Sequence, residues 1–480
     1  MFVNRADELA ALRERWESDR AELFVLYGRR RVGKSRLLLH FGADRRMLYF
    51  EATSGSARDH LEDLSAVLAD VSGRRLHAEQ PLSSWRAAFA AFAELLEEGP
   101  VMIVLDEFQF IAHREPEIGS LINRFIAEHE DNPGLLLCLS GSDVSFFENE
   151  MRYPATSYGR RTGSLKLKPF RWPQIEPFVE GRSVADQIRA WAVFGGIPYY
   201  LTELDPQLPL EETILRSILY PDGKLREEPR FLLAQEGRIR DRGTYMSILR
   251  AIAAGRTRLN DIAQHVGKPH TEARSFLEVL EEMELIERRH PVTHPSSKRV
   301  SYAICDPFLR FWFRFVAPRE SRLHSRSSAE GYLREGVLPR LDAFVSESAF
   351  EDVCRQWTFD NMPQAAAVGS WWGSIRHSED GQVRSRRYEA DVAVVDEAGR
   401  VIALGSCKWP QAENTDHRHP TAELEKLEVI RKHLDAPEAK LLFFDRVGFS
   451  ERLEQLAAER EDVELIRVEE MRRARTIERP

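Results

Sequence analysis

The sequence predicts an α/β protein that begins with a three-layer domain built on a parallel β-sheet. Three observations support this fold class. Short runs such as ELFVLY and VMIVLD alternate with helical patterns, these runs are apolar throughout, and a glycine-rich turn joins the first of them to a helix. Strands that are apolar on both faces are typical of a parallel sheet covered by helices on either side. We expect this domain to span residues 1–170.

The composition is that of a globular protein with more than one core. The chain has 480 residues, of which 43% are hydrophobic and 30% are charged, and both fractions are ordinary for folded domains. The formal net charge is -9. This charge excludes nucleic-acid binding through overall positive charge, so any such binding requires a local basic surface.

Cysteine usage and the amino terminus indicate the compartment. The four cysteines form no C-x-x-C pair, so the sequence predicts neither a zinc finger nor a disulfide framework. The amino-terminal MFVNRADELA carries charges where a signal peptide needs an apolar core, and no run of 18 apolar residues is present. We therefore expect a cytoplasmic protein without a membrane span.

The glycine-rich turn GRRRVGKS matches the phosphate-binding motif G-x-x-x-x-G-K-[ST]. It follows the strand ELFVLY and opens the helix SRLLLHF, which is the context that the motif requires. Backbone N–H groups would surround phosphate at the helix start, Lys34 would pair with the β- and γ-phosphates, and Ser35 would coordinate Mg²⁺. The candidate nucleotide contacts in this segment are Gly28, Arg29, Arg30, Arg31, Val32, Gly33, Lys34, Ser35 and Arg36.

The strand VMIVLDE ends in two carboxylates, which suits the carboxyl end of a buried parallel strand, where ligands bind. We expect Asp106 to hold Mg²⁺ through water and Glu107 to orient and deprotonate the attacking water. The alternative is an ordinary strand end with solvated acids.

Two later segments offer further contacts to the phosphates. The strand LLLCLSGS ends in Ser140 and Ser142, either of which would sense the γ-phosphate unless the segment is a simple turn. Arg160 and Arg161 would supply an arginine finger, in cis or from a neighbouring subunit of a homo-oligomer, or else form a surface basic pair.

The rest of the chain divides into four predicted parts. Residues 171–240 are expected to form a helical lid, in which Gly195 and Gly196 interrupt a helix. Residues 241–318 show three helical patterns and a hairpin, the layout of a winged helix. A polar linker over residues 319–343 and a second α/β domain over residues 344–480 follow.

In this order, NRADELAALRE, GRRRVGKS, LDEFQ, LSGS, YGRR and FGGIPYYL resemble the archaeal-type ATPase family, which is related to AAA+ and STAND ATPases. DPFLRFWFRF, FEDVC, YEADVAVV and ALGSCKW resemble the domain of unestablished function that is often fused to it. The resemblance implies strand order 5-1-4-3-2, ATP as the nucleotide, and Lys34, Asp106 and Glu107 as the Walker residues. It also makes Asn4 and Arg5 candidates for contacts to the base.

The winged helix predicts a DNA-binding surface. Its third helix would start near His270 and include Arg274, and its wing would offer Arg288, Arg289, Lys298 and Arg299. Basic residues outnumber acidic ones between Arg240 and Arg314, although EVLEEMELIE places several acids on the third helix. The alternative is a winged helix that only relays contacts between domains.

The last domain resembles the PD-(D/E)xK nuclease fold. Its candidate residues are Glu351 on a helix, Glu389 and Asp391 on one strand, and Lys408 on the next. Relatives carry GECKW where this chain has GSCKW, so Ser406 replaces the expected acid and weakens Mg²⁺ binding. The alternative is an inactive fold in which Asp391 and Lys408 form an ion pair.

Together these features predict a Mg²⁺-dependent ATPase that acts as a nucleotide-controlled switch on duplex DNA or a protein partner. The alternatives are a nuclease gated by ATP and a scaffold that holds nucleotide without turnover.

Overall fold

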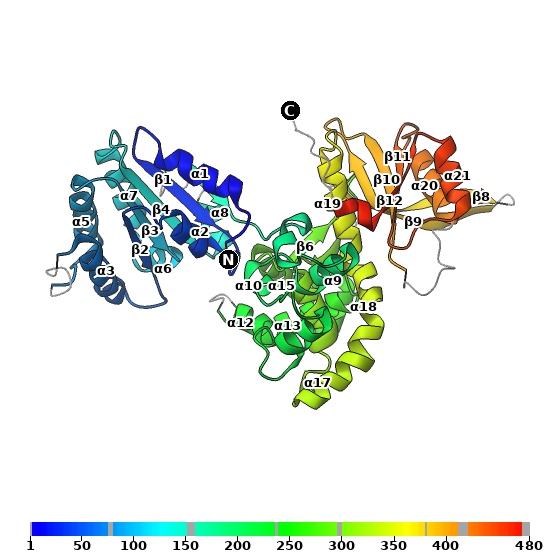
Figure 1. Ribbon diagram of the computed structural model, residues 1–480, viewed down its shortest axis with the longest axis horizontal. Coiled ribbons are helices and arrows are strands. Elements are labelled where there is room, and N and C mark those ends of the chain that lie inside the picture. The colour runs from blue at the N-terminus through cyan, green and yellow to red at the C-terminus, as the bar shows by residue number, and fades with distance from the viewer. Residues whose placement is uncertain are drawn as a thin grey trace. The chain divides into compact units, whose positions relative to one another are not determined.

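Figure 1 shows a computed structural model of the chain, which describes residues 2–74, 80–150, 159–235, 239–294, 300–379, 382–410 and 421–472. The chain folds as two compact units, Met1–Pro169 and Phe170–Pro480. Among the helices of the described part, none has both the length and the apolar character needed to cross a bilayer.

The first unit is built on a five-stranded sheet in which every neighbouring pair is parallel. The strand order is β2-β3-β4-β1-β5, which confirms the predicted order 5-1-4-3-2. The strands are β1 (Glu22–Tyr27), β2 (Met47–Glu51), β3 (Val101–Asp106), β4 (Leu135–Gly141) and β5 (Gly163–Lys166).

Helices cover both faces of this sheet, and strand β1 shows why. Because successive side chains of a strand point to opposite faces, Leu23 and Val25 enter one core and Phe24 and Leu26 enter another. The predicted three-layer architecture is therefore confirmed. The helices are α1 (Ala6–Trp16), α2 (Lys34–Phe41), α3 (Ala57–Ser72), α5 (Trp85–Glu97), α6 (Gln109–Arg114), α7 (Ile118–Glu128) and α8 (Val144–Glu150).

The second unit begins with short helices at the place predicted for a lid. Helix α9 ends at Phe194 because Gly195 takes a left-handed φ of 64°, and Pro198 starts α10. These glycines interrupt a helix as predicted. The elements are a 3-10 helix (Trp172–Phe178), α9 (Val184–Phe194), α10 (Pro198–Leu201), α11 (Leu210–Ile214), a π-helical turn (Leu215–Leu219) and α12 (Glu228–Ala234).

The predicted winged helix is present. Three helices precede a two-stranded antiparallel sheet in which Ile286 lies opposite Ile304. The backbone N–H of Tyr302 donates to the carbonyl of Thr257 over 2.7 Å, which ties the sheet to the segment before the second helix. The elements are α13 (Arg242–Ala253), α14 (Leu259–Val266), α15 (His270–Glu282), β6 (Ile286–Arg289) and β7 (Ser301–Ile304).

The prediction of a polar linker over residues 319–343 is wrong, because most of this segment is helical. Leu333, Val337 and Leu341 repeat every four residues, so one face of the helix is apolar and buried. The elements from the winged helix onward are α16 (Pro307–Phe311), a π-helical turn (Trp312–Val316), a 3-10 helix (Glu320–Arg322), α17 (Arg326–Tyr332), a π-helical turn (Leu333–Val337), α18 (Leu338–Val345), a π-helical turn (Ser346–Phe350) and α19 (Glu351–Asn361).

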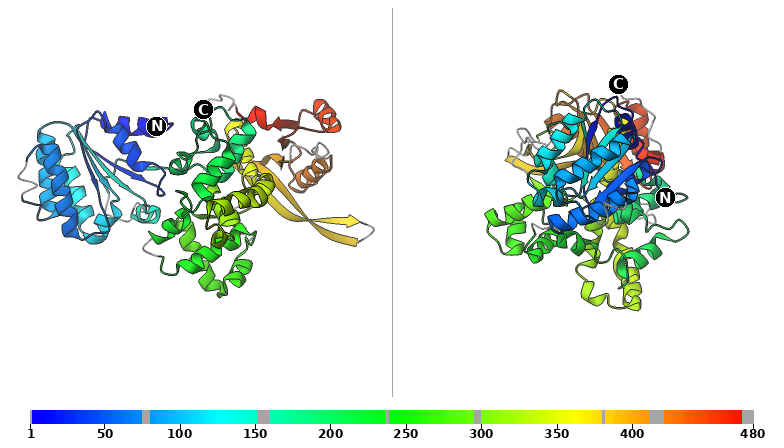
Figure 2. Two further views of the ribbon diagram at one scale, coloured as in Figure 1. Left: turned by 60° about the horizontal axis from the view of Figure 1, so that its bottom comes forward. Right: turned by 90° about the vertical axis from the view of Figure 1, so that its left-hand side faces the viewer.

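The carboxyl-terminal domain contains a mixed sheet of five strands in the order β12-β11-β10-β9-β8. Strands β8, β9 and β10 pair antiparallel, whereas β10, β11 and β12 pair parallel. The elements are β8 (Ala367–Glu379), β9 (Gln382–Val395), β10 (Val401–Lys408), α20 (Thr421–His433), β11 (Lys440–Asp445), α21 (Glu451–Glu459), β12 (Val463–Arg467) and a 3-10 helix (Val468–Arg472). Figure 2 shows the long hairpin of β8 and β9, in yellow, reaching beyond the other strands of this sheet.

Candidate functional site

The glycine-rich turn connects β1 to α2 as predicted. Gly28 and Gly33 have φ values of 152° and 98°, which side chains rarely allow. A Cβ atom on Gly28 would also lie 2.3 Å from the carbonyl oxygen of Leu167. Lys34 is the first residue of α2, and its Nζ donates to the carbonyls of Gly28 and Arg29 at 2.9 and 3.2 Å. The loop therefore encircles the ammonium group that is expected to meet phosphate.

Asp106, at the end of β3, faces the first turn of α2. The hydroxyl of Ser35 donates to Asp106 Oδ2 over 2.6 Å, and the hydroxyl of Tyr49 donates to the same oxygen. Hydroxyl and carboxylate oxygens are ligands that Mg²⁺ accepts. The structure thus brings together the two predicted metal-binding residues.

Glu107 lies beside the strand that is expected to sense phosphate. Its φ of 49° is in the left-handed region, a strained conformation often found at functional sites. Its Oε2 accepts a hydrogen bond from the hydroxyl of Ser142 at 2.7 Å and another from the side-chain amide of Gln109. Ser140 is fully buried, and its carbonyl accepts from the N–H of Phe108. Of the two candidate serines, the structure therefore places Ser142 beside Glu107.

Burial and charge affect several ionisable groups of this site. Burial lowers the pKa of Lys34, and the carboxylates of Glu107 and Asp106 oppose this change. Burial also raises the pKa of Glu51 at the end of β2, and Asp106 and Glu107 raise it further. Because an opposite charge stabilises the charged form of a buried ammonium group, a phosphate next to Lys34 would counteract the effect of its burial.

Sequence reasoning did not identify Tyr49, Glu51 or Gln109. Tyr49 and Glu51 lie at the end of β2, and Glu51 is directly opposite Asp106 in the register. Because parallel strands end at the same edge of the sheet, the carboxyl end of the strand MLYFE was an available signal. Gln109 lies in a helix and carried no such signal.

Arg5, a predicted contact to the base, bonds the protein itself. Its side chain is 8% exposed, and its guanidinium donates to Glu8 at 2.8 Å, to the carbonyl of Val32 at 3.1 Å and to the carbonyl of Lys168 at 2.9 Å. Arg5 therefore links the phosphate-binding loop, through Val32, to the segment that follows β5, through Lys168. Asn4 is exposed and has a φ of 57°.

The other arginines of the predicted site are dispersed. Arg36 is exposed on α2, and Val32 is buried in the core under α2. Arg160 donates to Glu130 at 2.8 Å near the amino end of β1. The phosphate-binding loop follows the opposite, carboxyl end of this strand. This position does not supply a finger in cis, whereas a role for Arg160 or Arg161 in trans stays a prediction.

The candidate residues of the carboxyl-terminal domain lie on α19, β9 and β10. Arg355 donates to Glu351 at 3.2 Å and to the carbonyl of Asp391 at 2.7 Å. Asp391 Oδ2 accepts the backbone N–H of Cys407 at 2.8 Å. Within the described residues, no three His, Cys, Asp or Glu side chains converge closely enough to hold a metal ion.

Ser406, which replaces the expected acid, is accompanied by a carboxylate that the sequence did not reveal. Glu423 of α20 accepts a hydrogen bond from the Ser406 hydroxyl at 2.9 Å, and its other oxygen lies 3.2 Å from Lys408 Nζ. Burial raises the pKa of Glu423, but Lys426 and Lys408 lower it to about 2. Lys408 therefore pairs with Glu423 instead of forming the predicted ion pair with Asp391.

Some of the basic residues predicted to bind DNA on the winged helix form ion pairs with acidic residues of the protein. Arg288 pairs with Glu281 of α15 at 2.7 Å, and Arg289 pairs with Glu287 at 2.7 Å. Lys298 and Arg299 lie outside the described residues. Arg274 of α15 makes no ion pair with another residue of the described part.

Comparison with family models gives three matching segments. Residues 2–204 match an ATPase domain predominantly from Archaea, residues 245–290 match the IclR helix-turn-helix domain, and residues 312–419 match archaeal and bacterial proteins of unknown function.

Two proteins of Methanocaldococcus jannaschii and a solved structure are similar to this chain. An uncharacterised protein of Methanocaldococcus jannaschii is 28% identical over 419 residues, which are 87% of this chain and 89% of that protein. An uncharacterised ATP-binding protein of the same organism is 54% identical over 41 residues, which are 8% of this chain and 70% of that protein. The Walker-type ATPase of Pyrococcus abyssi has a TM-score of 0.50 at 21% identity, over 65% of this chain and 96% of that one, and this likeness concerns the fold alone. The chain therefore belongs to the family of ATPases found predominantly in Archaea, through its domain of residues 2–204.

Proposed function

We propose that this ATPase uses Mg²⁺ and works as a nucleotide-controlled switch, which changes how the second unit binds a partner. The observation that carries the proposal is the arrangement at the carboxyl edge of the first sheet. Lys34, the Ser35–Asp106 pair and the Glu107–Ser142 pair come from three different segments and meet beside one loop.

Each group has a chemical task in this proposal. Lys34 exchanges the carbonyls of Gly28 and Arg29 for phosphate oxygens, since an ammonium group binds an anion more strongly than a neutral carbonyl. Ser35 and Asp106 would hold Mg²⁺, which when bound neutralises charge on the phosphates. Glu107 accepts a proton from the attacking water, and Ser142 holds its carboxylate in place.

The switch would act through the hydrogen bonds of Glu107. In the structure, the carboxylate is held by Ser142 at the end of β4 and by Gln109 at the start of α6. A γ-phosphate near Ser142 would compete for the backbone N–H of this serine, which donates to Glu107 at 3.3 Å, while the hydroxyl stays on the carboxylate. The conformation of the β4–α8 connection would then depend on which nucleotide is present, and this dependence is what a switch requires.

The hydrolysis proposal is tested by phosphate release and nucleotide binding in Lys34→Ala and Glu107→Gln, with Mg²⁺ and with EDTA. Lys34→Ala should lose binding, because the ammonium group held by the carbonyls of the loop is removed. Glu107→Gln should bind ATP but release phosphate at least a hundredfold more slowly. Equal release by the wild type and Glu107→Gln would instead support the scaffold that holds nucleotide without turnover.

The switch proposal is tested by partner affinity. DNA and RNA of several forms would be titrated onto the full chain with a non-hydrolysable ATP analogue, with ADP and without nucleotide. A difference of at least fivefold between the first two states is expected. Identical affinities in all three states would contradict the switch.

A second candidate function is a nuclease, which Glu423 favours. The carboxylate lies against Ser406, at the place where the expected acid is missing, and beside Lys408. The sheet of antiparallel β8–β9–β10 and parallel β11, together with helix α20, supports this candidate. A metal site is not formed in the described residues, so Asp391 and Glu423 would have to approach each other when a metal binds.

The nuclease is tested with Mg²⁺ and labelled DNA and RNA substrates. Cleavage should disappear in Lys408→Ala and in Glu423→Gln, and the double variant Ser406→Glu/Glu423→Gln should recover part of it. No cleavage of any substrate by the wild type would remove this candidate. Cleavage that persists in Glu423→Gln would show that this residue does not replace the acid.

A further inference from the structure

A cleft of about 990 Å³ lies between the winged helix and the carboxyl-terminal domain. One wall is formed by Arg258 at the start of α14, Arg274 of α15 and Tyr302 of β7. The opposite wall is the hairpin of β8 and β9, with Trp372 and Arg387. All of these elements belong to the second unit.

The hairpin turns one of its two faces toward the cleft. Trp371 and Ile375 are buried in the core under α20, so Trp372 and Ser374, which alternate with them on β8, point to the other face. Trp372 pairs with Glu389 and Ser374 pairs with Arg387, and these four residues line the cleft. The alternation of the strand thus separates an apolar face from a polar face that carries an aromatic ring.

Three arginines of the cleft have charge available for a ligand. Arg288 and Arg289 also line it, but acidic side chains of the protein pair with both. Arg258, Arg274 and Arg387 form no ion pair with any residue in the described ranges. Arg387 does lie close enough to Glu389 for its charge to counteract the rise that burial causes in the pKa of Glu389. These three cations lie on both walls, which suits a polyanion that passes between them.

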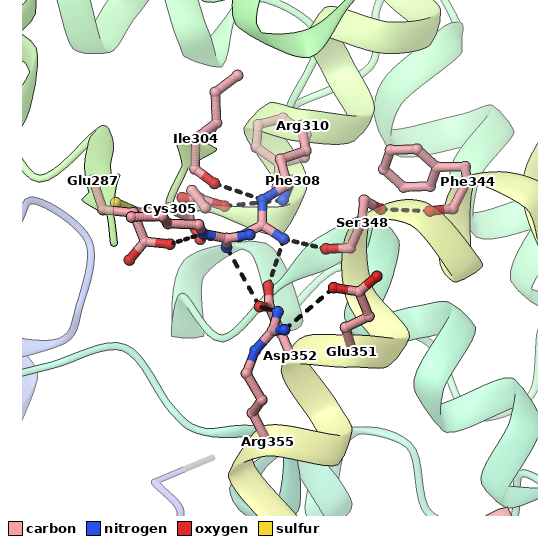
Figure 3. A network of polar contacts seen from close by, with 12 residues as sticks. Glu287, Ile304, Cys305, Phe308, Arg310, Phe344, Ser348, Glu351, Asp352 and Arg355 are labelled. Carbon is pink, nitrogen blue, oxygen red and sulfur yellow. Dashed lines mark hydrogen bonds and ion pairs between the residues drawn. The ribbon is translucent and has the colours of Figure 1, made fainter. Parts of the chain in front are cut away.

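A partly buried ionic network fixes the two walls relative to each other. In Figure 3, Asp352 of α19 accepts hydrogen bonds from Arg310 of the helix after the wing and from Arg355 of its own helix, both at 2.6 Å. Arg289 of β6 lies 3.4 Å from the same carboxylate. These arginines hold the pKa of Asp352 well below its usual range in spite of burial. The cleft is therefore part of one packed unit and is preformed for a ligand.

The size of the cleft and the presence of a ring decide which kind of polyanion fits. A volume of about 990 Å³ is in the range of pockets that enclose a small molecule. It accommodates a few nucleotides of one strand, whereas a duplex needs an open surface that an entire groove can cover. The indole of Trp372 is half-buried and offers a surface on which a base can stack, an interaction typical of single-strand binding.

We propose that this cleft binds a single-stranded nucleic-acid segment, with phosphates on Arg258, Arg274 and Arg387 and a base stacked on Trp372. The inference deepens the proposed function and rests on it, because it assigns a class to the partner of the switch. It departs from the duplex expected for a winged helix, since Glu278, Glu281 and Glu282 lie on the third helix.

The carboxylates of Glu351 and Glu389 also line the cleft. Without a cation they repel phosphate, so the strand has to follow the arginines and pass these acids at a distance. Removing the charge of Glu389 should therefore strengthen binding. Opposite effects of substitutions at Arg387 and Glu389 would show that these side chains act on bound phosphate. Two residues that only supported the fold would both weaken binding when substituted.

The experiment measures the fluorescence anisotropy of two labelled oligonucleotides, a single strand of twelve nucleotides and a hairpin with a stem of twelve base pairs. Each is titrated with the full chain without ATP or ADP. Arg274→Ala and Arg387→Ala should each weaken single-strand binding about 5- to 10-fold and reduce the dependence on salt by roughly one phosphate contact. Trp372→Ala should weaken it about 5- to 100-fold, and Trp372→Phe should retain most of it. Glu389→Gln should tighten it.

Arg386→Ala is the matched control, because Arg386 is exposed on the same strand, next to Arg387, and pairs with Ile375 on the other face. It should change the affinity less than twofold. Equal losses in Arg386→Ala and Arg387→Ala, or a duplex that binds as tightly as the single strand, would overturn the proposal. Because the titration contains no ATP or ADP, a negative result would not bear on phosphate release. The two proposals can therefore be judged separately.

Discussion

The hydroxyl of Ser142 lies 2.7 Å from the carboxylate of Glu107 and donates a hydrogen bond to it. Glu107 follows β3, and Ser142 follows β4, which is the neighbour of β3 in the sheet. The residue expected to activate water and the residue expected to detect the γ-phosphate are therefore in direct contact.

Ser142→Ala should lower kcat more than it changes KM. A hydrogen bond to a charged carboxylate contributes about 1.5–3 kcal/mol, so we expect a fall in kcat of roughly 10- to 100-fold. Steady-state phosphate release at several ATP concentrations measures both quantities. Ser120→Ala, at an exposed position of α7, is the control. A large rise in KM with unchanged kcat would show that Ser142 binds nucleotide and does not position Glu107.

Arg5→Ala should weaken binding of ATP and of inorganic triphosphate by the same factor. Arg5 supports the carbonyls of Val32 and Lys168, so its loss loosens the phosphate-binding loop whatever base is attached. We expect about a tenfold effect, measured by calorimetry with both ligands. A loss confined to ATP would instead support the contact to the base that the sequence predicted.

Removal of Mg²⁺ should abolish turnover, and Ser35→Ala should shift its requirement to higher concentration. Ser35 and Asp106 are 2.6 Å apart and supply two oxygens on one side of the site. Phosphate release would be titrated with MgCl₂ after treatment with EDTA, and Ser35→Thr should behave like the wild type because it keeps the hydroxyl. Turnover that continues in EDTA would contradict a metal-assisted mechanism.

Asp342→Asn should destabilise the second unit in a manner that depends on pH. Although burial alone raises the pKa of Asp342, hydrogen bonds from Arg189, Arg446 and Trp409 lower it to about 2. A carboxylate with a lowered pKa stabilises the fold above its unfolded pKa of about 3.9, and this contribution disappears as the pH falls toward 2. The difference from the wild type should be about 2 kcal/mol at pH 7 and should shrink below pH 4.

Denaturant unfolding at pH 7, 5, 4 and 3 measures this difference. Asp222→Asn is the control, since Asp222 and Arg326 form an ion pair at the surface, where such pairs contribute little. A difference between wild type and Asp342→Asn that stays constant from pH 7 to pH 3 would show that packing, and not charge, is the cause.

The amino-acid sequence was sufficient to predict the phosphate-binding loop and its sheet. The turn from Gly28 to Ser35 depends on local backbone geometry, and the strands around it are apolar throughout because both of their faces are buried. Lys34, Asp106 and Glu107 lie at the ends of such elements, so their meeting follows from the rule that parallel strands end at one edge. Features of this kind depend on a few adjacent residues and on a periodic pattern.

The segment of residues 319–343 shows where sequence reasoning failed. Its many arginines and serines indicated a linker, but Leu333, Val337 and Leu341 are enough to bury one face of a helix. The polar residues occupy the remaining surface. A composition averaged over the segment concealed the helical spacing of Ala329, Leu333, Val337 and Leu341.

Contacts between distant side chains were decided by the tertiary structure alone. Glu423 lies on a helix 17 positions after Ser406, and no periodic pattern relates the two residues. Their contact exists because α20 packs on the sheet that contains β10 and turns this carboxylate toward the strand. The cleft with Arg274 and Trp372 has the same origin, since its walls come from separate parts of the chain and are joined through Asp352. Local sequence fixes which elements form and which of their faces are apolar, whereas the pairing of polar groups depends on how those elements pack against one another.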